Sequence, residues 1–475
     1  MEKNLSKSYI SGFLPYAFAA LLVGLVGGFT TMLGPSFVKE LNLPYSNTTW
    51  TALSMAVSTA ALAPVMGKVA DVKGRRKTLL FGIVLFALGN TFTAIAGSLV
   101  FMMLARFIVG AGSAAIAPVI MSYIVTEFPA EETAKGFSLY MLISSASVIL
   151  GPIIGGIIIE KSSWRIMMWI CSAISTLVFI LCLFTLKDPF NEEKSFKGFD
   201  YKGAFTVLVF FSLILCIPSF GQNFGWNSTY FISVTIASVI VFALLVPIEK
   251  KAEKPILSGS FILRKEFILS VIALFLTQGL MQANMTNLIV FVNYTQPGNT
   301  IISSYAISVM YIGMSLGSVI AGPMADKKEP KSVLFLTFVI TGIGCAVMFL
   351  FNVYTSAPLL MASLGILGFG LGGNATIFMK IVLSGLPPQT VGAGTGTYGL
   401  FRDLSAPFGV AVFVPMFTNG ITNRINSGIT PEISAVASMR FLALAEIICV
   451  IAGIVVVLML PRIRNIKGKG KYYET

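Results

Sequence analysis

Long runs of apolar residues, separated by short polar segments, cover almost the whole chain. A helix needs about 20 mostly apolar residues to cross a bilayer, and fourteen runs approach or exceed that length. Their approximate limits are 13–38, 49–67, 78–96, 99–126, 137–159, 165–186, 203–220, 230–248, 267–292, 301–322, 333–352, 358–383, 392–418 and 439–460. The pattern therefore predicts an all-α membrane protein with fourteen transmembrane helices.

The polar segments between these runs indicate the orientation of the chain. An even number of spans puts both termini on one side, and a cytoplasmic N-terminus places 25 of the 33 lysines and arginines in cytoplasmic segments. Cytoplasmic loops of membrane proteins carry such an excess of basic residues. We therefore expect a multi-pass protein of the bacterial inner membrane with both termini in the cytoplasm.

Composition agrees with this picture and limits the possible partners. Of the 475 residues, 56% are hydrophobic and 11% are charged, whereas soluble proteins carry about 25% charged residues. The net charge of +13 lies mostly in the predicted cytoplasmic loops, and no basic surface with interleaved aromatic residues competes with that explanation. We expect contact with the lipid bilayer and none with nucleic acid.

The residue inventory excludes most catalytic chemistry. The chain has no histidine, which removes Ser-His-Asp relays and histidine-ligated zinc. Its five cysteines stand in apolar runs without CxxC spacing, so they indicate neither a metal site nor a disulfide framework. The loops are too short for a catalytic domain, and no phosphate-binding GxxxxGK[ST] motif occurs. We expect no enzyme activity, cofactor or metal, and transport energy from an ion gradient.

A repeated loop divides the chain. Segments 67–77 and 322–331 both read Gly-x3-Asp followed by basic residues, 255 residues apart. Parallel six-helix repeats are a known transporter plan, with substrate bound where the halves meet. We therefore predict a six-helix bundle at 1–186, two inserted helices with cytoplasmic linkers at 187–266, a second six-helix bundle at 267–460, and a basic cytoplasmic tail at 461–475.

The motifs resemble those of the major facilitator superfamily. Segment 67–77 is similar to the family's signature loop, and Arg106 to Gly112 follows its R-x3-G-x-G pattern. The number of spans and Trp164-Arg165 resemble the fourteen-helix drug:proton antiporter branch. The antiporter motif of the fifth helix is represented by Gly151, Pro152, Gly155 and Gly156. Two positions depart from that branch: segment 27–32 has no acidic residue, and Ser147 replaces the first glycine of the antiporter motif.

Within this superfamily, three segments resemble proton-coupled bile-acid transporters: 47–53, 277–287 and 395–403. That resemblance implies uptake of unconjugated bile acids together with protons, by alternating access. The antiporter motif keeps a second interpretation open, a multidrug:proton antiporter that exports hydrophobic compounds. A membrane sensor without transport activity is a third. We expect a monomer.

A charge within a bilayer is costly and indicates function. Asp403 is our first candidate for the proton carrier, with Arg106 and Glu446 as further candidates for proton coupling. A static salt bridge of Asp403, a structural hydrogen bond of Arg106 and a tertiary partner of Glu446 are the alternatives. Three cations, with Lys380 and Arg402 included, outnumber two carboxylates. This balance favours an amphipathic organic anion that pairs with Arg402 or Arg106.

The run at 267–292 is unusually polar for a membrane span, so its amides need partners inside the bundle. They line the substrate cavity or join helices. Our candidates for substrate binding are Arg402, Gln278, Gln282, Asn284, Asn287, Trp50, Tyr311 and Asn374.

The repeated loop is predicted to act as a conformational latch that pairs in one state and releases in the other. Its residues are Gly67, Asp71, Gly74, Arg75, Arg76 and Asp326. A purely topogenic role of its basic residues is the competing explanation.

Overall fold

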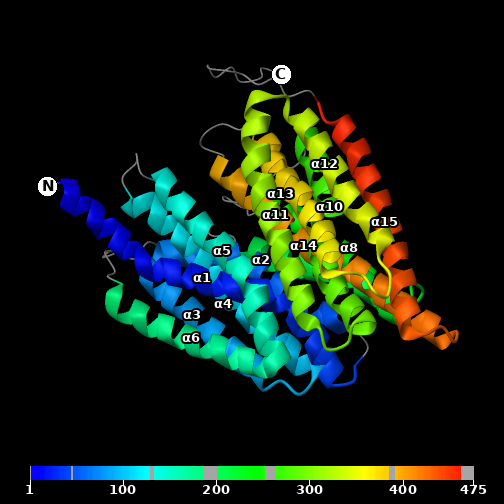
Figure 1. Ribbon diagram of the computed structural model, residues 1–475. Coiled ribbons are helices and arrows are strands. Elements are labelled where there is room, and N and C mark those ends of the chain that lie inside the picture. The colour runs from blue at the N-terminus through cyan, green and yellow to red at the C-terminus, as the bar shows by residue number, and fades with distance from the viewer. Residues whose placement is uncertain are drawn as a thin grey trace. The chain divides into compact units, whose positions relative to one another are not determined.

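A computed structural model shows how these segments fold. It describes residues 2–43, 47–128, 133–186, 201–251, 264–383 and 391–461. The helices of the first part are α1 (Glu2–Glu40), α2 (Thr48–Lys73), α3 (Arg75–Ala94), α4 (Leu99–Glu127), α5 (Thr133–Lys161), α6 (Trp164–Thr185), α7 (Tyr201–Phe224) and α8 (Thr229–Lys251). The later helices are α10 (Lys265–Thr295), α11 (Thr300–Lys327), α12 (Pro330–Val347), the 3-10 turn η2 (Met348–Leu350), α13 (Ala357–Leu383), α14 (Val391–Asn426) and α15 (Pro431–Met459) (Figure 1).

The all-helical class is confirmed. Within the described ranges, twelve helices are long and apolar enough to cross a membrane. The two α-helices outside this group are α2 and α7, and α7 contributes a shorter apolar stretch at Phe205–Ile214. The protein is therefore a multi-pass membrane protein, and the total of fourteen spans stays a prediction.

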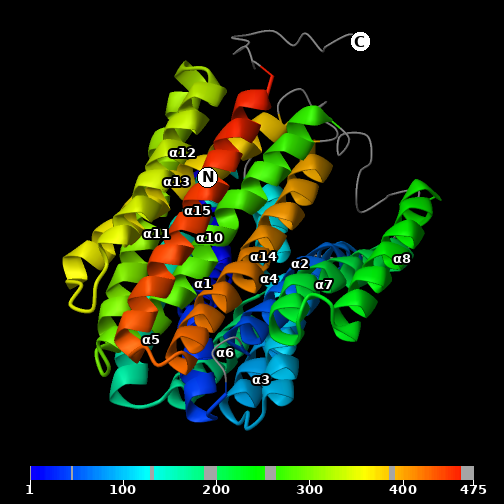
Figure 2. The ribbon, with the colours of Figure 1, turned by 90° about the vertical axis from the view of Figure 1, so that its right-hand side faces the viewer.

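The chain forms two compact units. Unit 1 comprises Met1–Ile214 with Ile236–Lys254, and unit 2 comprises Leu215–Thr235 with Pro255–Thr475. In unit 1, α1 packs on α5, α2 on α4, and α3 on both α4 and α6. In unit 2, α10 packs on α14, α11 on α13, and α12 on both α13 and α15 (Figure 2). The six helices from α10 onward thus repeat the pairing order of the first six.

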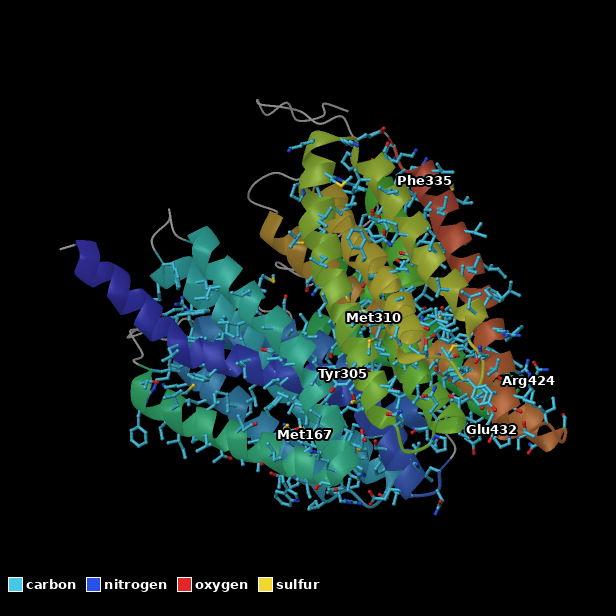
Figure 3. All side chains as sticks on the ribbon, viewed as in Figure 1. Met167, Tyr305, Met310, Phe335, Arg424 and Glu432 are labelled. Carbon is cyan, nitrogen blue, oxygen red and sulfur yellow. The ribbon has the colours of Figure 1, made fainter. Side chains whose placement is uncertain are left out.

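Apolar side chains cover the outside of the helices as well as their interior (Figure 3). Phe335 on α12 is 43% exposed and Phe184 on α6 is 81% exposed, while Met310 on α11 is fully buried. Because lipid tails are as apolar as these side chains, exposure to lipid carries no hydrophobic penalty. Aromatic contacts hold the core of unit 1, among them the stacked rings of Tyr16 and Tyr123, whose centroids are 4.3 Å apart.

Glycines allow the closest helix pairs to touch through their backbones. A Cβ atom on Gly317 of α11 would lie 2.0 Å from the carbonyl oxygen of Phe369 in α13, and one on Gly372 would lie 2.0 Å from the carbonyl oxygen of Met314. Small residues permit such approach between membrane helices. The α11–α13 pair therefore depends on glycine at these positions.

Candidate functional site

Arg106 is a fully buried cation in the first third of α4. Its side chain has no exposed surface. Its Nη2 atom donates to Thr30 Oγ1 of α1 at 2.8 Å and to Met55 Sδ of α2 at 2.7 Å. The Thr30 hydroxyl in turn donates to the Val26 carbonyl at 2.6 Å. Three helices of unit 1 therefore meet around this guanidinium group.

The guanidinium group keeps unused donors. Arg106 Nε and Nη1 have no hydrogen-bond partner among the described residues, and no described carboxylate forms an ion pair with this side chain. Arginine carries five N–H donors, and a buried charge without a counter-charge is strongly unfavourable. The group is therefore suited to bind an anion.

The spacing of the R-x3-G motif explains how α2 reaches this arginine. Gly110 follows Arg106 by one helical turn, and a Cβ atom on Gly110 would lie 2.3 Å from the Met55 carbonyl oxygen. This contact brings the Met55 thioether within reach of the guanidinium group. Ser58 of α2 also donates to the Phe107 carbonyl of α4 at 2.7 Å, which holds the two helices together.

Two predicted site residues meet in unit 2. Glu446 of α15 is fully buried, and its Oε1 atom accepts a hydrogen bond from Asn284 Nδ2 of α10 at 2.8 Å. Asn284 also donates to the Leu280 carbonyl at 3.0 Å. The sequence predicts proton coupling for Glu446 and substrate binding for Asn284, and the structure joins the two residues by this hydrogen bond.

The other amides of α10 also reach neighbouring helices. Gln278 Nε2 donates to the Leu371 carbonyl of α13 at 2.9 Å, and Asn287 Nδ2 donates to the Phe413 carbonyl of α14 at 3.4 Å. Gln282 is half-buried. Gln278 and Asn287 therefore join α10 to neighbouring helices, one of the two roles that the sequence allows for these amides. Contact of the same amides with a substrate stays a prediction.

Asn374 of α13 is held between helices in the same manner. Its Oδ1 atom accepts from Thr337 Oγ1 of α12 at 2.6 Å, and its Nδ2 atom donates to Thr341 Oγ1 at 3.4 Å. The two bonds occupy both ends of the amide. Asn374 therefore joins α12 to α13 in this conformation.

The remaining substrate candidates differ in their exposure. Trp50 on α2 and Tyr311 on α11 are half-buried, and Arg402 on α14 is exposed. Asp403 belongs to α14, but its side chain lies outside the described residues. Lys380 of α13 donates to the Ala325 carbonyl of α11. The assignment of Asp403 as proton carrier stays a prediction.

The basic residues of the repeated loop bind helix ends. Arg76 at the start of α3 donates to the Leu183 carbonyl near the end of α6 at 2.8 Å. Lys331, 255 positions later, donates to the Leu458 and Leu460 carbonyls at the end of α15 at 2.6 and 2.9 Å. A cation at a helix C-terminus satisfies free carbonyls and the helix dipole. This shared capping role has no signal in the local sequence.

The structure describes several residues of the predicted latch, whose switching role stays a prediction. Arg75 lies 3.5 Å from Glu127 Oε1 at the end of α4. Gly74 has a φ of 95° between α2 and α3, a conformation that favours glycine. Gly67 belongs to α2, where the nearest atom to an added Cβ is Pro118 Cβ at 3.7 Å. The side chains of two further latch residues, Asp71 and Asp326, lie outside the described residues.

Trp164 and Arg165, which resemble a feature of the fourteen-helix antiporter branch, form a polar cluster with Glu40, a residue outside the predicted site. Arg165 of α6 contacts Glu40 of α1 through Nη2 at 2.8 Å and Nε at 3.0 Å, and it donates to the Ala94 carbonyl of α3 at 2.7 Å. Trp164 Nε1 donates to the same Glu40 carboxylate at 2.5 Å. This cluster joins the ends of three helices of unit 1. The sequence singles out Trp164-Arg165 by resemblance, but it does not indicate that Glu40 is their partner.

The fifth-helix motif packs α5 onto α1. A Cβ atom on Gly151 would lie 2.6 Å from the Leu25 carbonyl oxygen, and one on Gly155 would lie 2.6 Å from Phe29 Cβ. Pro152 and Gly156 of the same motif are buried. Ser147 occupies the place of the motif's missing glycine, and its Cβ would lie 2.5 Å from a Cβ on Gly24. Glycine at position 24 therefore makes room for Ser147.

This compensation predicts a rescue. We expect Gly24→Ala to destabilise the protein by about 1–3 kcal/mol, the usual cost of overpacking, and Ser147→Gly in the same chain to restore most of the loss. Thermal unfolding of the purified single and double variants measures the coupling. Gly27→Ala, where nothing lies within 4 Å, is the matched control. Independent, additive effects of the two substitutions would contradict the contact.

Comparison with known proteins agrees with the fold and its motifs. The family model described as Major Facilitator Superfamily matches residues 16–410. Multidrug resistance protein 3 of Bacillus subtilis (strain 168) is 26% identical over 79% of this chain and 73% of its own length. The riboflavin transporter RibZ of Clostridioides difficile (strain 630) is 23% identical over 92% and 94%. The multidrug transporter protein MdtP of Bacillus subtilis (strain 168) is 23% identical over 90% and 78%.

Solved structures show the same fold at low identity. A point mutant of the nucleoside transporter NupG has a TM-score of 0.69 and 13% identity, over 94% of this chain and 99% of that one. An auto-inhibited POT family peptide transporter has a TM-score of 0.67 and 12% identity, over 98% and 100%. With most of the chain matched by the family model and the helices folded in the same manner, this protein belongs to the Major Facilitator Superfamily and is a membrane transporter rather than an enzyme.

Proposed function

We propose that this protein is a proton-coupled secondary transporter that imports an amphipathic organic anion, such as an unconjugated bile acid, by alternating access. The observation that carries the proposal is the buried guanidinium group of Arg106 with two nitrogens unpartnered among the described residues. A carboxylate substrate supplies the acceptor that these N–H groups lack, and charge-assisted bonds of this type are strong. The Met55 thioether beside the group suits an apolar body.

The charge balance supports an anion over a cation. A site for cationic drugs needs a carboxylate, whereas the buried charge of unit 1 is an arginine without an acidic partner among the described residues. One proton carried with one monoanion is electroneutral, so the membrane potential does not oppose uptake. Coupling to a proton therefore suits a positively charged site that binds a monoanion.

Asp403 is the proposed proton carrier, and the exposed Arg402 beside it on α14 is the proposed second contact for the substrate. Adjacent residues on a helix differ by about 100° in direction, so the two side chains serve different partners. The ends of α2 and α11, which carry Asp71 and Asp326, are the proposed latches between the two access states. We propose a monomer in the bacterial inner membrane with both termini in the cytoplasm.

Uptake of radiolabelled cholate into cells that express the protein tests the proposal. We expect uptake above that of vector-only cells and its loss when a protonophore collapses the proton gradient. Asp403→Asn should show the same loss without the protonophore. Cholate uptake that the protonophore leaves unchanged would reject the proton coupling, and uptake equal to that of vector-only cells would reject the substrate.

A second candidate function is multidrug:proton antiport. Two relatives carry names that describe multidrug resistance or transport, and the fifth-helix motif packs against α1. Ethidium accumulation separates the candidates, because an exporter lowers the dye content of cells and an importer of anions does not. Ethidium exclusion together with absent cholate uptake would establish this second function instead.

A further inference from the structure

Glu446 carries a buried carboxyl group in unit 2, and the proposed anion site at Arg106 does not include it. Its Oε1 atom accepts one hydrogen bond, from Asn284 at 2.8 Å, and its Oε2 atom has no hydrogen-bond partner among the described residues. The side chain has no exposed surface. An ionised carboxylate normally accepts several hydrogen bonds or pairs with a cation. The other groups around Glu446 therefore decide whether its carboxyl group is protonated or ionised.

Among the described residues, the groups that face Glu446 are neutral. The elements packed against α15 are α10, α12, α14 and η2. Asn284 contacts the carboxyl group from α10, the thiol of Cys345 lies beside it from α12, and Cys449 lies beside it on α15 itself. The described residues of α14 and η2 place no charged group against it. The carboxyl group therefore has an amide and two thiols as polar neighbours.

The described cations on α12 and α15 are engaged elsewhere. Lys331 binds the Leu458 and Leu460 carbonyls, which lie about 18–21 Å from Glu446 along α15 at 1.5 Å per residue. Arg440 precedes Glu446 by six residues, which turns it to another side of the helix, and it donates to the Phe351 carbonyl. Glu432 lies near the start of α15, about 21 Å away by the same rise.

The charged groups described on α10 and α14 also lie away from Glu446. Arg424 donates to Ser438, about 12 Å along α15 from Glu446. Arg402 follows Phe401, whose ring packs on Phe267 near the start of α10. Lys265 and Glu266 belong to that same end of α10, about 25 Å or more along the helix from Asn284. No described cation compensates a charge on Glu446.

The internal repeat shows that packing alone does not require an acid at this place. Arg165 of α6 and Arg440 of α15 each donate to a backbone carbonyl at the end of α3 or just after α12. Six residues after each arginine stand Cys171 in unit 1 and Glu446 in unit 2. A small neutral side chain therefore fills the corresponding place in unit 1, although it lies close to the buried Arg106 there.

We propose that Glu446 is a proton-binding site within unit 2. It holds a proton in the packing seen here, because this environment stabilises the neutral acid, and it releases the proton only in a conformation that lets water enter between α10 and α15. The inference rests on the proposed function in one respect, because it adds a second proton site to the carrier proposed at Asp403. Proton release from Glu446 is linked to the separation of α10 and α15.

Infrared difference spectroscopy of the purified protein in lipid tests the protonation directly. At neutral pH we expect the carbonyl stretch of a protonated carboxyl group, and its loss in Glu446→Gln, which keeps the shape of the side chain. Asn284→Ala should shift this band to higher frequency, because the carbonyl oxygen loses its donor. Unchanged bands in Glu446→Gln, or a band insensitive to Asn284→Ala, would overturn the proposal.

A transport experiment in proteoliposomes separates coupling from structure. We expect Glu446→Gln to retain cholate exchange without a pH gradient and to lose cholate accumulation driven by a pH gradient. A purely structural side chain would leave the ratio of the two rates at its wild-type value, which would reject the coupling role. The infrared test uses no transported substrate, so absence of cholate transport in the wild type would reject the proposed function and leave the proton site standing.

Discussion

Replacing Arg106 with methionine is expected to reduce cholate uptake by about 10- to 100-fold without loss of the folded protein. A hydrogen bond to a charged group contributes about 1.5–3 kcal/mol, and about 1.4 kcal/mol corresponds to a factor of ten. The variant removes the donors of Nε and Nη1, which have no protein partner among the described residues. Initial uptake rates over a range of cholate concentrations measure the effect.

Stability distinguishes a binding role of Arg106 from a structural one. Because the guanidinium group is buried without a counter-charge among the described residues, its replacement by an apolar side chain should leave the thermal midpoint unchanged or raise it. Arg440→Met is the matched control, since that arginine donates only one described bond, to the Phe351 carbonyl, and lies outside the site. A large drop in the midpoint of Arg106→Met would show that the arginine holds the helices together.

Alanine at Gly317 is expected to be strongly destabilising for unit 2. The added Cβ would lie 2.0 Å from the carbonyl oxygen of Phe369, so α11 and α13 must separate to admit it. Overpacking of a well-packed core costs about 1–3 kcal/mol and occasionally more, and a clash with backbone cannot be relieved by a rotamer change. Thermal unfolding of the detergent-purified protein, followed by size-exclusion chromatography, measures the loss.

The same helix offers a control for that change. Gly322 of α11 has Thr376 Cγ2 at 3.4 Å from its added Cβ, which is ordinary contact. Gly322→Ala should therefore change the thermal midpoint little, while Gly372→Ala, with its Cβ 2.0 Å from the Met314 carbonyl oxygen, should reproduce the loss of Gly317→Ala. Equal midpoints for Gly317→Ala and Gly322→Ala would contradict the close backbone contact between α11 and α13.

The sequence pointed to Arg106, Glu446 and Asn284 as buried polar residues and left their partners open. Arg106 and Glu446 stand out because charges are rare in apolar runs, and that argument needs no structure. Asn284 was recognised as an amide that requires a partner, but the partner lies 162 positions away in the chain. Periodicity reports which side chains share one helix face, and it carries no information about the helix that covers that face.

The sequence by itself determined the membrane class, the helical content and the internal repeat, because these follow from local composition and from a spacing of 255 residues. The tertiary structure decided that Gly24 accommodates Ser147, that Arg76 and Lys331 cap the last helix of each repeat, and that Glu446 faces an amide rather than a cation. The physical reason is that charge compensation and steric fit depend on atoms within a few ångströms, and in a helical bundle those atoms belong to distant parts of the chain.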